Sequence, residues 1–115
     1  EQEFKKAAVV ATRVISKLDA HTYCLDLGHK SIASEFPFPR VEFLSPHKIT
    51  QTGHSEEHLI IKTEEADVFH PGQLLRAFPF HICPTVALYD HVQVISNGNV
   101  IDQWKVIARN RKITI

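Results

Sequence analysis

The chain has 115 residues, which is enough for one domain with a hydrophobic core and too few for two. Its hydrophobic fraction of 43% and charged fraction of 23% are those of an ordinary globular protein, which excludes a disordered tail. Thirteen basic residues balance thirteen acidic ones, and no apolar run reaches the roughly 20 residues that span a bilayer. These features argue against nucleic acid or a membrane as a partner.

The chain contains no methionine, and its first residues lack the charged and then apolar pattern of a secretory signal. We therefore expect that it begins inside a longer protein. Two cysteines, Cys24 and Cys83, are too few for a disulfide framework. Free thiols are typical of a reducing compartment, so the expected location is cytoplasmic.

The first half of the chain begins with two predicted strands, residues 7–18 and 21–27. Both are rich in β-branched residues, and the link between them is short enough for an antiparallel hairpin. In the second strand, alternation places Tyr23, Leu25 and Leu27 on one face.

Residues 34–55 look irregular, because three prolines and a glycine interrupt both the helical and the strand periodicity. Within them we expect only one short strand, residues 41–44. Further strands are expected at residues 58–63, 73–80 and 86–88.

The clearest local signal is Asn97-Gly98 between two apolar-rich runs, residues 91–96 and 99–108. Asn-Gly is the preferred pair for a two-residue type I′ hairpin turn. This register would place Ile95 opposite Val100, and His91 opposite Trp104.

A last alternating run, residues 109–115, predicts a final strand, and no segment shows the periodicity of an amphipathic helix. Seven or eight short strands in one domain indicate an all-β fold. We expect a small antiparallel β-barrel or sandwich.

His81 and Cys83 are the first candidates for chemistry. Residues two apart in an extended segment point to the same side, and an imidazole with a thiolate suits zinc. Pro79 and Pro84 on either side would stiffen the segment. The pair alone is incomplete, and the other interpretation is a small buried cysteine beside a hydrogen-bonded histidine.

The segment Ser55-Glu56-Glu57-His58 is the second candidate. His58 is a candidate catalytic acid or base, or a third metal ligand, with a neighbouring glutamate to orient it. The alternative is a solvated turn ahead of a strand.

The segment Asp26-Leu27-Gly28-His29-Lys30 is the third candidate, since it places a carboxylate and two basic groups around a glycine. Such a turn is a candidate receptor for a phosphate or a substrate carboxylate. A charged hairpin end is the alternative.

These segments, read in order, resemble the C-terminal domain of the D-serine dehydratase and D-threonine aldolase family. These are pyridoxal-phosphate (PLP) enzymes related in fold to alanine racemase. The resemblance rests on four stretches: 23–34 (YCLDLGHKSIAS), 55–58 (SEEH), 79–90 (PFHICPTVALYD) and 104–109 (WKVIAR).

The resemblance implies that residues 1–115 form a single C-terminal β-domain, and that an N-terminal TIM barrel binding PLP through a lysine is absent. In such enzymes the β-domain supplies a metal pair, here His81 and Cys83, to an active site often shared within a homodimer. The expected metal is zinc or another divalent ion, and the expected substrate is a small D-amino acid that undergoes dehydration or aldol cleavage. The fragment alone would have no turnover.

Two other functions remain open at this point. The first is a racemase-like protein of the same fold in which His81 and Cys83 bind no metal. The second is a non-catalytic β-barrel binding module.

Overall fold

A computed structural model of the chain describes residues 4–114, which form eight strands and two short helices. The strands are β1 (Val10–Lys17), β2 (Thr22–Leu25), β3 (Val41–Phe43), β4 (Ile49–His54), β5 (Leu59–Thr63), β6 (Leu74–Pro79), β7 (His91–Ser96) and β8 (Asn99–Lys105). The helices are α1 (Ile82–Val86) and the 3₁₀ turn η1 (Ile107–Arg109).

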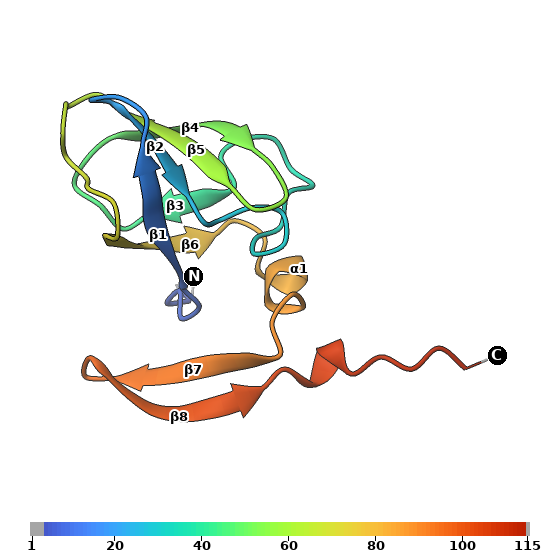
Figure 1. Cartoon of the computed structure of the whole chain (residues 1–115). Helices are drawn as coiled ribbons and strands as arrows, with labels where there is room; N and C mark the ends of the chain where they lie inside the picture. Colours follow the sequence, from blue (N-terminus) through green and yellow to red (C-terminus); the bar gives the residue numbers. More distant parts are fainter. Residues whose placement is uncertain (1–3, 115) are drawn as a thin grey trace.

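Six strands form a nearly closed antiparallel barrel in the order β3-β6-β1-β2-β5-β4 (Figure 1). Strand β1 connects the two halves of this barrel, because its first residues pair with β6 and its later residues pair with β2. An irregularity between Val14 and Ser16 marks the change of partner. Irregularities of this kind bend a strand, which lets one strand turn the corner of a small barrel. The predicted all-β fold is therefore confirmed, and of the two expected forms the chain adopts the barrel.

The core fills the inside of this barrel with aliphatic residues, one tyrosine and one phenylalanine. The predicted inward face of β2, which continues to Leu27 just past the strand, is confirmed. It consists of Tyr23, Leu25 and Leu27, each at most 1% exposed. Tyr23 also packs edge-on against Phe69, with 5.4 Å between the ring centroids. The other buried members of the core are Val10, Val14, Ile32, Val41, Leu59, Ile61, Leu75 and Ala77.

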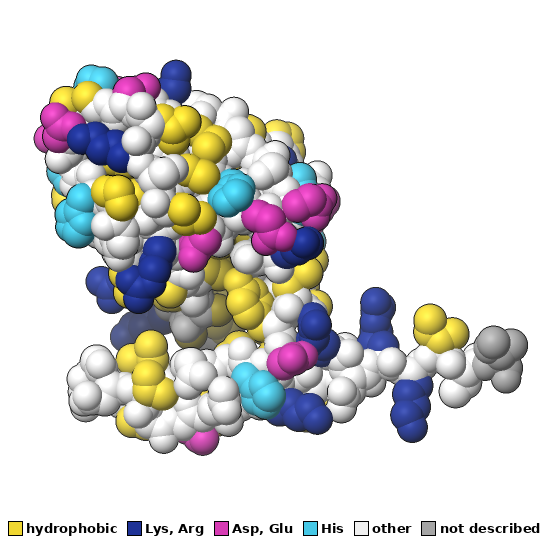
Figure 2. All heavy atoms as spheres, viewed as in Figure 1, with side chains coloured by type: hydrophobic (Ala, Val, Ile, Leu, Met, Phe, Trp, Pro, Cys, Tyr) yellow, Lys and Arg dark blue, Asp and Glu magenta, His cyan; other side chains and the backbone are white. Residues whose placement is uncertain are grey.

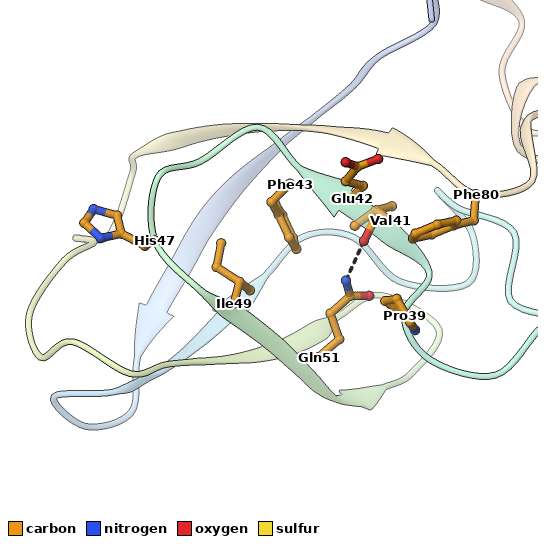
Figure 3. Close-up of a pocket in the computed structure, with 8 residues that line it drawn as sticks. All are labelled: Pro39, Val41, Glu42, Phe43, His47, Ile49, Gln51 and Phe80. Atoms are coloured by element: carbon orange, nitrogen blue, oxygen red, sulfur yellow. Dashed lines mark hydrogen bonds between the residues drawn. The ribbon is translucent and has the colours of Figure 1, made fainter.

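The remaining gap in the barrel lies between its two edge strands, β3 and β4. The side chain of Gln51 on β4 spans this gap. Its Nε2 donates to the carbonyl of Val41 at 2.7 Å (Figure 3). Its Oε1 accepts from the backbone N–H of Arg40 at 2.8 Å. A pocket of about 230 Å³ lies over the gap, lined by Pro39, Val41, Glu42, Phe43, His47, Ile49, Gln51 and Phe80.

Strand β4 was not expected from the sequence, which predicted irregular chain across most of residues 34–55. It forms because it pairs along β5, with a register shift between Gln51 and Gly53 that accommodates the glycine. Pro46 lies before the strand, where its missing N–H costs no ladder hydrogen bond. Strand β3 matches the short strand expected at residues 41–44.

Strands β7 and β8 form the predicted hairpin, which lies apart from the barrel beyond α1 (Figure 1). Asn97 and Gly98 have φ angles of 49° and 78°, as a type I′ turn requires. Ile95 lies opposite Val100 as predicted. A register shift after Val94 then moves His91 opposite Lys105, so the predicted pairing of His91 with Trp104 is wrong.

The hairpin exposes apolar side chains to solvent, some of which are seen on its surface in Figure 2. Its most exposed large apolar residues are Ile95, Val100, Ile101 and Trp104.

Two other predicted strands are not found. The expected strand at residues 86–88 is instead the end of helix α1 and the turn after it. The expected strand at residues 109–115 is not formed over the described residues 109–114, which end η1 and continue as irregular chain. Neither run pairs with a strand among residues 4–114, and a single run cannot form a ladder alone. No helix among the described residues is long and apolar enough to span a membrane.

Candidate functional site

His81 and Cys83 lie at the start of helix α1, directly after the end of barrel strand β6. His81 has an extended backbone and precedes the helix, whereas Cys83 lies in its first turn. Pro84 is tolerated there because the first turn of a helix has N–H groups without helical partners. The extended geometry that placed both side chains on one side is therefore wrong. Their role as metal ligands remains a prediction.

The imidazole of His81 is held by two neighbouring residues of the segment that follows β2. Its Nδ1 contacts the Oε1 of Glu35 as an ion pair or hydrogen bond. Its ring stacks on Phe36, with 5.0 Å between the ring centroids and 25° between the planes. Glu35 has a lowered pKa, mainly because its own backbone N–H bonds to the carboxylate, with His81 adding to the effect.

Helix α1 is tied to the same segment by two further hydrogen bonds. The hydroxyl of Thr85, which is 1% exposed, donates to the carbonyl of His81 at 2.8 Å and accepts from the N–H of Ala33 at 3.1 Å. The hydroxyl of Tyr89 donates to the carbonyl of Ser31 at 2.8 Å. Residues 31–36 and the α1 region therefore form one packed unit around His81.

Cys83 is exposed and, like Cys24, is a free thiol, as the cysteine count predicted. Over residues 4–114, no three His, Cys, Asp or Glu side chains come together in a way that could hold a metal ion. The described residues therefore do not bring His58 to His81 and Cys83 as a third ligand. Any further ligand would come from substrate, water or another polypeptide segment.

His58 lies in the turn between β4 and β5, with its side chain exposed. Its backbone carbonyl accepts from the N–H of Ser55 at 2.9 Å, which closes the turn. Its neighbours Ser55, Glu56 and Glu57 are exposed as well, so the described residues supply no direct support for a catalytic role. That role stays a prediction.

The second and third candidate segments meet each other in the structure. The N–H groups of His29 and Lys30 donate to the carbonyls of Ser55 and Glu56, at 2.9 and 3.2 Å. Gly28 makes this approach possible, because a Cβ at that position would overlap the backbone of Glu56. The backbone N–H groups of this turn are thus used within the protein and are not free to receive a phosphate.

Asp26 is also committed to the fold. Its Oδ1 accepts from the hydroxyl of Thr12 at 2.6 Å and from the backbone N–H of Arg13 at 2.7 Å. These bonds fix the corner where β1 changes partner. The alternative interpretation of the third segment, a structural hairpin end, is the one that the contacts favour.

His54 was not predicted from the sequence as a site residue, and it contacts Leu27 and His29 of the third candidate segment. Its Nε2 donates to the carbonyl of Leu27 at 2.8 Å, and its ring packs edge-on against His29 at 4.4 Å between centroids. Its buried Nδ1 has no hydrogen-bond partner among the described residues. Burial lowers the pKa of His54, and the nearby His29 and Arg40 add to that effect.

Glu35 and Phe36 were also missed. No spacing rule links them to His81, because 46 positions of chain separate Glu35 from its partner. Only the path of the segment after β2, which runs back past the end of β6, brings them together.

Comparison with known proteins identifies the family of this chain. A family model described as "putative serine dehydratase domain" matches residues 7–95. The chain belongs to this family. That match confirms the resemblance stated from the four sequence stretches.

Two kinds of relatives are found. An uncharacterized protein of Mycobacterium tuberculosis is 32% identical over 113 residues, and the match covers 91% of this chain and 85% of that protein. A D-threonine aldolase of an Arthrobacter species is 34% identical over 107 residues, covering 92% of this chain but only 28% of the aldolase.

A solved structure also matches this chain as one part of a longer D-threonine aldolase. The crystal structure of D-threonine aldolase from Filomicrobium marinum superposes with a TM-score of 0.84 at 22% identity, covering 94% of this chain and 30% of that one. The fold is thus that of one region of a much larger chain.

Proposed function

We propose that this chain is the C-terminal β-domain of a PLP-dependent lyase that acts on a small D-amino acid, of the D-serine dehydratase or D-threonine aldolase type. The observation that carries the proposal is that nearly the whole chain corresponds to 28% of a D-threonine aldolase at 34% identity. In this proposal an N-terminal barrel domain binds PLP, which stabilises a carbanion at the substrate Cα. The complete enzyme is a cytoplasmic homodimer.

His81 and Cys83 are the proposed metal ligands, and their surroundings fit that role in part. The Cys83 thiol is exposed and unpaired. The Nδ1 of His81 contacts Glu35, while its Nε2 has no hydrogen-bond partner within residues 4–114. A nitrogen and a sulfur donor suit zinc, which would act as a Lewis acid on the substrate's hydroxyl and carboxylate. His58 is retained as a candidate acid or base.

The test is to purify the natural polypeptide that carries this chain, load it with PLP and zinc, and supply D-serine and D-threonine. Ammonia release from D-serine would identify a dehydratase, and glycine with an aldehyde from D-threonine would identify an aldolase. His81→Ala and Cys83→Ala should each lower the rate at least about tenfold if they hold the metal. Racemised product with no effect of either variant would favour a racemase-like enzyme without a metal.

A second function is favoured by the Mycobacterium relative, of which the matched region makes up 85%. A relative of that size has no room for a large cofactor domain of its own. It supports a β-barrel binding module that works without catalysis or alongside a separate enzyme. If the natural polypeptide binds no PLP and converts neither amino acid, the binding module becomes the preferred function.

A further inference from the structure

We propose that Glu35 is the positioning residue of His81: it holds the imidazole in the Nδ1–H form and so leaves Nε2 as the nitrogen that binds the metal. This inference rests on the proposed function, because it concerns the orientation of one ligand of the proposed pair. It also makes a claim about the protein without metal, namely which ring nitrogen carries the proton.

The two nitrogens of the His81 imidazole are chemically distinct. A neutral imidazole carries one N–H and one lone pair, and the hydrogen bond at one nitrogen decides which is which. The Nδ1 of His81 faces a carboxylate oxygen of Glu35, which accepts hydrogen bonds and donates none when ionised. The proton is therefore kept on Nδ1, and the lone pair is left on Nε2.

The plane of the His81 ring is fixed as well as its proton. Phe36, the next residue after Glu35, stacks on the imidazole at 25° between planes. A hydrogen bond at one edge and a ring against one face leave the imidazole little freedom to rotate. The two neighbours together define the direction in which Nε2 points.

The segment that bears Glu35 is itself anchored. Thr85 bonds to Ala33 on one side and to the His81 carbonyl on the other, and it is almost fully buried. Tyr89 bonds to Ser31, four residues before Glu35. Glu35 thus approaches His81 from a support attached to the same helix, which makes the contact a built feature of the fold.

The chain also contains a matched control pair. The Nδ1 of His47 lies 3.2 Å from the Oε1 of Glu65, and both carboxylates lie at the surface. His47 lies at the opposite end of the barrel gap from Phe80, the residue that precedes His81 (Figure 3). Removing Glu65 therefore deletes the same kind of contact far from the proposed ligands.

The first experiment measures the proton position by ¹⁵N NMR of the histidine rings of the metal-free chain at about pH 8, where imidazole is neutral. Wild-type His81 should show the Nδ1–H form. Glu35→Ala should shift it toward the mixture of a free imidazole, Glu35→Gln should retain the Nδ1–H form through its amide oxygen, and Glu65→Ala should leave it unchanged. Backbone amide spectra establish that each variant is folded. A wild-type His81 in the Nε2–H form, or an Nδ1–H form that persists in Glu35→Ala, would overturn the proposal.

The second experiment measures zinc affinity of the natural polypeptide by competition with a chelating dye. Glu35→Ala should weaken zinc binding about 10- to 100-fold, as loss of a partner to a ligating histidine does. Glu35→Gln should weaken it less, and Glu65→Ala should leave it unchanged. Equal affinities of wild type and Glu35→Ala, with binding still abolished by His81→Ala, would refute the positioning role while leaving the metal pair intact. If wild type binds no zinc, the metal part of the proposed function fails, and the NMR result alone decides the role of Glu35.

Discussion

Gln51 on β4 and Val41 on β3 are joined by a side-chain hydrogen bond of 2.7 Å, where a backbone ladder would otherwise close the barrel. The same amide accepts from the backbone of Arg40, so one side chain satisfies a donor and an acceptor on the facing segment. Gln51 is only 8% exposed. One glutamine thus replaces strand pairing at the barrel gap.

Replacing Gln51 with Ala should lower the free energy of unfolding by about 2–3 kcal/mol, because the Val41 carbonyl and the Arg40 N–H would both lose their partner. Urea denaturation followed by circular dichroism measures this change. Gln103→Ala, at an exposed position of β8, is the control and should change stability by less than about 0.5 kcal/mol. An equal effect of the two variants would show that the Gln51 bridge adds no stability.

Replacing Gly28 with Ala should destabilise the protein by at least about 2–3 kcal/mol, because the new Cβ would overlap the backbone of Glu56, which has little room to move. Gly53→Ala is the matched comparison. There a Cβ would lie 3.3 Å from the Cγ1 of Ile60, a side chain that is able to shift. The melting temperature of Gly28→Ala should lie well below that of Gly53→Ala. The reverse order would contradict the close approach of Gly28 to the backbone of Glu56.

The two cysteines should differ in reactivity toward iodoacetamide. Cys83 is exposed, whereas Cys24 is partly buried and burial raises the pKa of its thiol. Since the thiolate is the reactive form, Cys83 should be modified first at neutral pH, and Cys24 should need more alkaline conditions. Mass spectrometry of wild type, Cys24→Ser and Cys83→Ser measures both rates. Faster modification of Cys24 would contradict the burial of its thiol.

His54 should make stability depend on pH near neutrality. Its pKa is lowered in the folded protein by burial, so the unfolded chain takes up a proton at higher pH than the folded one. The contribution of His54 is therefore complete above its unfolded pKa of about 6.5 and is lost as the pH falls through the folded value. Urea denaturation between pH 8 and pH 5.5 should show that the free energy of unfolding decreases as the pH is lowered.

His54→Gln is the comparison for this effect, because its amide N–H is able to keep the bond to the Leu27 carbonyl. This variant should lose less stability than wild type over the same range. The carboxylates with lowered pKa values, Asp19, Glu35 and Glu57, titrate at lower pH and do not account for a change above pH 5.5. Parallel pH curves for wild type and His54→Gln would exclude His54 as the cause.

Much of the fold was predictable because local patterns reflect local physics. Alternation placed Tyr23 and its neighbours inward, and Asn97-Gly98 specified the hairpin turn through the positive φ angles that it permits. Strand β4 was not predictable in this way. Gly53 and the nearby prolines interrupt the strand pattern around it, and only pairing with β5 makes the segment a strand. Helix α1 was missed because five residues are too few to show a helical period.

The candidate site was likewise predictable only in part. The sequence by itself determined the residue types, an imidazole and a thiol two positions apart, and the ordered stretches by which the family was recognised. Only the tertiary structure decided that the pair spans the start of a helix and that Glu35 and Phe36 hold the histidine. The physical reason is that hydrogen bonding and ring stacking act over a few ångströms of space. A partner 46 positions away is brought into that range only by the folded path of the chain.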